Sequence, residues 1–209
     1  IWEELLGVRP IGITDNFFDL HGHSLLAVRL FDRIKSIWGK HLPLSILFQA
    51  PTIEHLAAIL RQEGWSANWS SLVTIQEGSS RPPLFIVSGL GGNVVRFRNL
   101  ARYLGADQPV FALQPLGMDG SQPYLTRIED MAAHYVREVK AKQPEGPYQL
   151  AGYSFGGLVV FEMARQLALA GNSVGLTALL DAPEWRYIAK TARSVNVMHR
   201  LEHLRSRIA

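Results

Sequence analysis

The feature that most constrains the fold is the segment Gly152-Tyr153-Ser154-Phe155-Gly156, which lies between an apolar strand-like run and an apolar helix-like run. In that setting, G-x-S-x-G is typical of a sharp strand-to-helix turn. Such a turn forces the serine into a strained backbone conformation, and a Cβ at either flanking glycine would collide with neighbouring chain. The segment therefore predicts that the Ser154 hydroxyl is raised above a sheet as a nucleophile. The alternative is a glycine-rich turn that only packs a helix on a strand.

A nucleophilic serine needs a base, and the base needs a carboxylate to orient it. In folds built around this turn the chain order is Ser, then Asp or Glu, then His. Asp181 ends the apolar run 176–180, at the strand end where open α/β sheets place functional groups. We expect Asp181 to be the orienting acid. It could instead cap a turn before Pro183, and Glu184 is a nearby alternative outside the strand.

Two backbone N–H groups are needed to stabilise an oxyanion. The residue directly after the serine, Phe155, can supply the first N–H. The loop 88–93 after the apolar run 84–87 is rich enough in glycine for its backbone to approach closely and supply the second. A dinucleotide-binding loop is the rival interpretation of 88–93. It fails the G-x-G-x-x-G pattern, because Val94 stands where the third glycine belongs.

The chain around this turn alternates between strand-like and helix-like segments, which indicates a mostly parallel sheet with helices on both faces. The expected strands are 72–75, 84–87, 110–113, 148–151 and 176–180, and the expected helices are 94–104, 127–142 and 155–170.

The first 62 residues instead predict an all-helical unit. Residues 24–38 carry apolar side chains at helical spacing, including Ile37 and Trp38 at the end. Thr52 is the expected N-cap of a further helix. Residues 2–6 and 43–48 suit shorter helical turns, and residues 64–71 lack periodicity and resemble a linker.

Several segments carry a family resemblance. Residues 84–100 and 152–157, with the strand end at Asp181, resemble the type I thioesterase domains of nonribosomal peptide and polyketide synthetases. The likeness covers residues 72 to about 185. Upstream, D-N-F-F-D-L-H-G-H-S-L at 15–25 resembles the peptidyl carrier motif, with His21 where glycine is usual.

The resemblance implies that Ser24 is esterified by 4′-phosphopantetheine, that Ser154 and Asp181 are the catalytic nucleophile and acid, and that Leu90 and Phe155 form the oxyanion hole. The position of Ser24 just ahead of a helix suits a phosphodiester, since the helix N-terminus is positive. A plain serine N-cap is the alternative there. His23 is expected to be a loop or partner-contact residue.

The expected organisation is a small all-α carrier domain at 1–63, a linker at 64–71 and an α/β-hydrolase thioesterase domain at 72–209. The resemblance implies that a lid begins at about 184–209. The implied partners are an acyl or peptidyl thioester, a phosphopantetheinyl transferase and upstream synthetase modules.

The general base is harder to find. Of the seven histidines, only His199 and His203 follow Asp181, within a basic and helix-like stretch. We expect both to lie on the surface of the lid, and His134 precedes the serine in the middle of a helix. The hydrolase domain is therefore expected to end before its histidine, and the 209 residues alone to show little esterase turnover.

Composition and charge narrow the classes of function that the chain could have. The formal charge of +3 is concentrated in 184–209, which carry six basic and two acidic residues. A solvated helical face explains that excess better than nucleic-acid binding, because no aromatic or Gly-rich signature accompanies it. No run is long enough to span a membrane, no metal-ligand cluster stands out, and the absence of cysteine leaves the cytoplasm as the default compartment.

The leading hypothesis is release of an acyl chain from the Ser24 arm through Ser154, with hydrolysis and macrocyclisation both open. One rival is a general esterase or lipase fused to an unrelated helical domain, which the carrier motif opposes. The other is a carrier fused to an incomplete, non-catalytic hydrolase-like domain that only docks partners.

Overall fold

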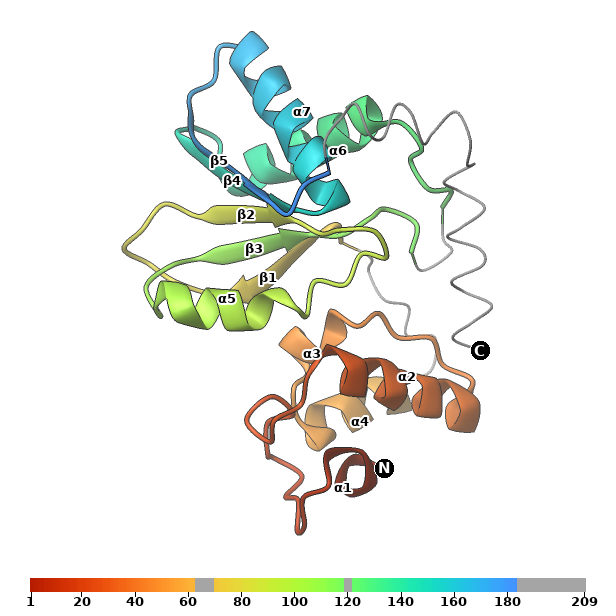
Figure 1. The fold of residues 1–209 in the computed structure, drawn as a ribbon. Helices are drawn as coiled ribbons and strands as arrows, with labels where there is room; N and C mark the ends of the chain where they lie inside the picture. The colour runs from red at the N-terminus through yellow and green to blue at the C-terminus, as the bar shows by residue number, and fades with distance from the viewer. Residues whose placement is uncertain (63–69, 119–121, 184–209) are drawn as a thin grey trace.

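The computed structural model describes residues 1–62, 70–118 and 122–183, which form a helical domain and a sheet domain (Figure 1). Most of the expected linker 64–71 and the whole of the expected lid at 184–209 lie outside these residues. Ser70 and Ser71 are the described end of the linker.

The helical domain is held by a core that its four helices share. They are α1 (Trp2–Leu6), α2 (Ser24–Trp38), α3 (Ile46–Gln49) and α4 (Ile53–Arg61). The core includes Phe17, Leu30, Ile34, Leu47 and Leu56. The apolar stripe of α2 ends at Ile34, because Ile37 and Trp38 remain more than half exposed. The predicted N-cap is confirmed, since the Thr52 Oγ1 accepts the His55 N–H at 3.2 Å.

Five strands form one sheet in the order β1-β3-β2-β4-β5. They are β1 (Leu72–Gln76), β2 (Leu84–Val87), β3 (Val110–Leu113), β4 (Tyr148–Tyr153) and β5 (Val174–Leu180). All neighbouring pairs are parallel except β1 with β3. The mostly parallel sheet predicted from the sequence is therefore confirmed. β5 is an edge strand, and its Leu176, Leu179 and Leu180 are exposed.

Helices cover both faces of this sheet (Figure 1). On β2, Phe85 and Val87 pack against α6 (Ile128–Lys142) and α7 (Phe155–Leu169). Leu84 and Ile86 point the other way and pack against α5 (Phe97–Leu104). Because both faces are buried, β2 is apolar throughout rather than alternating. The helix expected from residue 94 begins at Phe97, because a turn precedes it in which the Phe97 N–H donates to the Val94 carbonyl.

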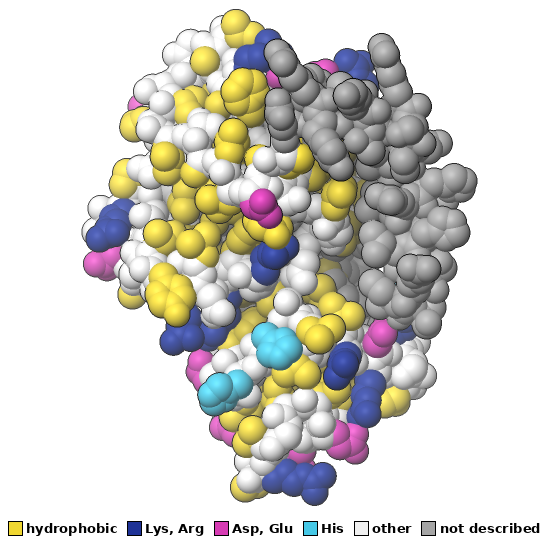
Figure 2. All heavy atoms as spheres, viewed as in Figure 1, with side chains coloured by type: hydrophobic (Ala, Val, Ile, Leu, Met, Phe, Trp, Pro, Cys, Tyr) yellow, Lys and Arg dark blue, Asp and Glu magenta, His cyan; other side chains and the backbone are white. Residues whose placement is uncertain are grey.

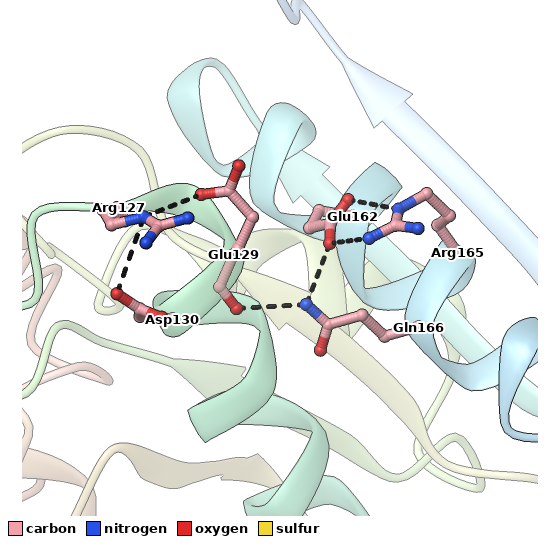
Figure 3. Close-up of polar contacts among 6 residues, drawn as sticks. All are labelled: Arg127, Glu129, Asp130, Glu162, Arg165 and Gln166. Atoms are coloured by element: carbon pink, nitrogen blue, oxygen red, sulfur yellow. Dashed lines mark hydrogen bonds and ion pairs between the residues drawn. The ribbon is translucent and has the colours of Figure 1, made fainter.

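Polar contacts fix α7 to α6 on the outside of the sheet (Figure 3). Gln166 on α7 donates to the Glu129 carbonyl oxygen on α6 at 3.0 Å and to Glu162 at 2.9 Å. Arg165 binds both carboxylate oxygens of Glu162, and this hydrogen bond lowers the pKa of Glu162. Since α7 begins directly after Ser154, these contacts hold the helix that follows the sharp turn.

The described end of the linker is tied to the sheet domain by the backbone and the side chain of Gln114. The Gln114 N–H and amide nitrogen donate to the carbonyl oxygens of Ser71 and Ser70 at 2.9 and 2.8 Å. The Gln114 amide also lies 3.4 Å from the Ser45 hydroxyl of the helical domain, and both side chains are buried. Gln114 therefore contacts the linker end and the helical domain together.

Candidate functional site

Ser154 lies in a strained turn between β4 and α7, with φ 52° and ψ −123°. The flanking glycines are required by space. A Cβ on Gly152 would overlap the Gly156 carbonyl, and a Cβ on Gly156 would overlap the carbonyl oxygens of Val87 and Ser88. The predicted strain and the predicted collisions are both confirmed. The turn presents Ser154, partly exposed, at the N-terminus of α7.

The end of β5 lies against this turn. The Ser154 N–H donates to the Leu180 carbonyl at 2.8 Å. On the other side of Asp181, the methyl group of Ala182 would be only 2.5 Å from a Cβ built on Gly157. Asp181 is thus bracketed by two residues that touch the serine turn. It is exposed and adopts a left-handed φ of 51°, whereas the alternative, Glu184, lies outside the described residues.

The Gly-rich loop after β2 meets the same turn. A Cβ on Gly89 would lie 3.4 Å from the Ser154 Cβ and 3.1 Å from the Tyr153 ring. The next residue, Leu90, is 57% exposed beside the serine. The loop that carries Leu90, the expected second N–H donor, is therefore in contact with the Ser154 turn. The Ser88 hydroxyl beneath it is buried and has no hydrogen-bond partner among the described residues.

Ser24 lies at a different helix start, on the helical domain. It is the first residue of α2, and the N-cap position belongs to His23, whose backbone is extended at φ −133°. The structure therefore does not place Ser24 at the N-cap, which was the alternative. Ser24 is partly exposed and its neighbour Leu25 is 56% exposed, so a group attached to the Ser24 oxygen reaches solvent at a positive helix end.

The loop before Ser24 is shaped by close packing. A Cβ on Gly22 would overlap the Phe17 carbonyl and its ring, so only glycine fits there. His21, where glycine is usual in the motif, has a left-handed φ of 64°. This departure leaves the chain path into Ser24 intact and places a side chain in a conformation that glycine adopts more readily.

Comparison with known families matches residues 82–206 to the thioesterase domain family and residues 1–60 to the phosphopantetheine attachment site. The chain belongs to the thioesterase domain family. It joins a carrier domain, the attachment site of 4′-phosphopantetheine, to a thioesterase domain, as nonribosomal peptide synthetases do.

Relatives of the chain are much longer proteins. It is 41% identical over 185 residues to malpinin synthetase of Mortierella alpina, which covers 88% of this chain and 2% of that protein. It is 39% identical over 182 residues to a dimodular nonribosomal peptide synthase of Bacillus subtilis strain 168, covering 87% and 8%. Indigoidine synthase of Dickeya dadantii is 43% identical over 175 residues, covering 83% and 12%. The chain thus spans a small fraction of these relatives.

The fold has a solved counterpart with both domains. A four-domain nonribosomal peptide synthetase in its holo form, bound to AMP and glycine, superposes with a TM-score of 0.57 at 34% identity. The match covers 88% of this chain and 14% of that one. The α/β-hydrolase architecture and the helical carrier domain predicted from the sequence are confirmed.

The structure adds a residue to the thioesterase site that sequence patterns did not reveal. The Arg96 guanidinium lies over the ring of Tyr153, 3.9 Å from its centroid. Tyr153 directly precedes Ser154, so a positive charge stands beside the nucleophile turn. Arg96 is exposed in the turn before α5, inside the segment 94–104 that the sequence predicts to be helical, and a single exposed arginine there gives no signal of a contact with Tyr153.

His134 is the histidine of the thioesterase domain that lies within the described residues, and its ring contacts Ser71. Its Nε2 shares a hydrogen bond with the Ser71 Oγ at 2.8 Å, at the start of β1. Burial lowers the pKa of the His134 ring, while Glu138 acts in the opposite direction. This agrees with the expectation that His134 is not the base. His199 and His203 lie outside the described residues.

Residues 1–62, 70–118 and 122–183 contain no gathering of three or more His, Asp or Glu side chains that could hold a metal ion. In the same ranges, every helix is too short or too polar to cross a bilayer.

Proposed function

We propose that this chain releases an acyl chain from its own carrier domain, by transfer from a thioester to Ser154. The observation that carries the proposal is the junction at Ser154, where the strained serine, the end of β5 and the loop after β2 meet. This junction brings a nucleophile, a carboxylate and a backbone donor loop to one end of α7.

The carrier site fits the covalent group that its family binds. We propose Ser24 as the attachment residue, because its oxygen lies at a helix N-terminus that favours a phosphodiester. Gly22 packs so tightly on Phe17 that the loop before Ser24 has a fixed path. When attached, 4′-phosphopantetheine supplies a thiol that holds the acyl chain as a thioester. A phosphopantetheinyl transferase is therefore a required partner.

In the proposed transfer, the Ser154 Oγ attacks the thioester carbonyl carbon. A C–O bond forms, the C–S bond breaks, and the proton lost by Ser154 passes through an imidazole base to the leaving thiol. The N–H groups of Phe155 and Leu90 donate to the oxyanion, and Asp181 orients the imidazole. Water or an internal nucleophile of the acyl chain then attacks the acyl-Ser154 ester, giving an acid or a macrocycle.

We further propose that neither His199 nor His203 is that base. His134 is engaged with Ser71 at β1, so the described residues 70–118 and 122–183 of the thioesterase domain offer no free histidine as a substitute. Clear thioester hydrolysis by the 209 residues that His199→Ala abolishes would overturn this assignment.

The division of the chain is proposed as carrier 1–63, linker 64–71 and thioesterase 72–209. Since the chain spans only 2–12% of the three curated relatives, the upstream synthetase modules are proposed partners too. They would supply the acyl or peptidyl thioester that Ser154 receives.

Two mass measurements test the proposal. Incubation with coenzyme A and a phosphopantetheinyl transferase should add one phosphopantetheine group, and Ser24→Ala should prevent it. In a longer chain that continues past Ala209, a fluorophosphonate probe should label Ser154, and Asp181→Asn, which tolerates the left-handed backbone, should slow labelling by at least about a hundredfold. A chain that is loaded at Ser24 but never labelled at Ser154 would instead favour a carrier fused to a non-catalytic docking domain.

A further inference from the structure

Val95 of the thioesterase domain is buried in the core of the carrier domain. It is 4% exposed and belongs to a cluster whose other buried members, from Trp2 to Leu56, all come from the carrier. Phe48 on α3 makes the reciprocal contact, because it packs against both the carrier core and the cluster around α5. The two domains therefore share apolar contacts at the turn before α5.

Arg98, three residues after Val95, contacts two residues of the carrier motif at 15–25. Its guanidinium lies over the Phe18 ring, 4.6 Å from the centroid, and 3.2 Å from the Asp19 carboxylate. Phe18 is in turn stacked on Phe48 at 5.4 Å. The Arg98 side chain is 23% exposed, and this partial burial lowers its pKa while Asp19 opposes the shift. Arg98 thus recognises an aromatic side chain and an acid together.

The same short segment reaches the nucleophile turn. Arg96, between Val95 and Arg98, lies over Tyr153, the residue before Ser154. On the carrier, Asp19 is five residues before Ser24, which limits their separation to about 17 Å even for a fully extended chain. Figure 2 shows basic side chains where the two domains meet, and histidines on the carrier side of that junction. Neighbouring residues of the segment 95–98 therefore contact both the carrier and the turn at Ser154.

We infer that segment 95–98 is the docking surface on which the thioesterase domain seats its own carrier for acyl transfer, with Arg98 as the positioning residue that binds Phe18 and Asp19. This inference rests on the function proposed above. Arg98 touches neither the substrate nor Ser154; it acts by raising the fraction of time that the carrier is seated beside the nucleophile turn.

The seating can be measured without catalysis. The chain has no cysteine, so His41→Cys on the carrier and Leu169→Cys on α7, both exposed, provide two positions for spin labels. A seated carrier gives a narrow distribution of label distances. Arg98→Asp and Asp19→Arg should each broaden it, and the two changes together should restore it, because the exchanged charges pair again. Arg98→Lys should give an intermediate result, since lysine keeps the charge and loses the planar stacking.

Transfer is measured in parallel with two probes, on a longer chain that continues past Ala209. One is a fluorophosphonate carried on the Ser24 arm, installed by a phosphopantetheinyl transferase, and the other is the same fluorophosphonate free in solution. Arg98→Asp should lower the ratio of arm-borne to free labelling of Ser154 about five- to tenfold. Arg102→Asp, one turn further along α5, is the matched control and should change the ratio less than twofold.

The outcomes separate the two proposals. Loss of seating together with a lower ratio, both reversed by the charge exchange, supports the docking role. Unchanged label distances in Arg98→Asp would overturn it, as would lost seating with an unchanged ratio. Arm-borne labelling that accelerates with protein concentration would place the contact between chains and overturn it too. Failure of the free probe to label Ser154 in a longer chain that continues past Ala209 would remove the proposed function itself.

Discussion

The backbone N–H of Ser154 donates a hydrogen bond to the carbonyl oxygen of Leu180, at 2.8 Å. This bond continues the pairing of β4 with β5 by one residue beyond the last strand pair, Tyr153 with Leu180. It fixes where β5 ends relative to the serine turn. Because Asp181 comes next, the sheet's own hydrogen bonding determines where the Asp181 backbone lies relative to the serine turn.

Glycine in place of Ser154 should stabilise the fold. The conformation at φ 52° and ψ −123° is costly for any residue with a Cβ, so Ser154→Gly should raise the free energy of unfolding by about 1–2 kcal/mol relative to Ser154→Ala. Both variants lose labelling by a fluorophosphonate. Chemical denaturation of the pair measures the difference, and equal stability would show that the turn stores no strain.

Alanine in place of Gly156 should be severely destabilising. Its Cβ would overlap the Val87 and Ser88 carbonyl oxygens, which belong to a central strand and cannot move freely. We expect a loss of about 2–3 kcal/mol in the free energy of unfolding. Gly175→Ala on the edge strand is the control, because its nearest neighbour is the Pro147 Cβ at 3.2 Å. The melting temperature of Gly156→Ala should lie far below that of Gly175→Ala, and similar melting temperatures would contradict the crowding at Gly156.

Glycine in place of His21 should stabilise the carrier domain. The left-handed backbone at φ 64° costs a residue with a side chain about 1 kcal/mol or more in the folded state. Glycine removes this cost, but the greater freedom of glycine in the unfolded chain offsets part of the gain. We expect a net gain of about 0.5–1 kcal/mol for His21→Gly. His21→Ala keeps the Cβ and should give no gain. A stability loss in His21→Gly, measured by urea denaturation, would mean that the histidine makes a compensating contact.

Stability should fall in mild acid because of His134. Burial lowers the pKa of its ring below the ordinary 6.5, so the folded protein binds a proton less readily than the unfolded chain. The stabilisation is therefore complete above the unfolded value and is lost as pH falls through the folded one. Melting temperatures between about pH 7.5 and pH 5 should decline less steeply in His134→Gln than in the unaltered chain. His55→Gln, exposed on α4, should leave the slope as it was, and parallel curves for all three proteins would refute the prediction.

The elements near Ser154 could be predicted because their signals are local. The spacing of Gly152 and Gly156 implies a turn too tight for side chains, and the apolar run ending at Asp181 marks a strand end. The paired strands and covering helices follow from the alternation of strand-like and helix-like segments, with element ends that differ by at most three residues.

The contacts that the sequence did not reveal join residues far apart in the chain. Ser71 and His134 are 63 positions apart, and Arg98 and Asp19 are 79 apart. Arginine or histidine at such positions has no period and no motif, so only the folded arrangement shows its partner. The exposure of Ile37 and Trp38 has the same origin, because helical spacing predicts a shared face but not how far the packing partners extend.

Few side chains join the carrier to the thioesterase domain in the described part of the chain. Apolar packing of Val95 and Phe48, the stacked guanidinium and partly exposed ion pair of Arg98, and the Gln114–Ser45 contact contribute about 1–2 kcal/mol each, which is less than a permanent interface provides. An association this weak dissociates by thermal motion alone. The carrier can therefore detach from Arg98 and return without a trigger, at a rate that the lifetime of these contacts sets.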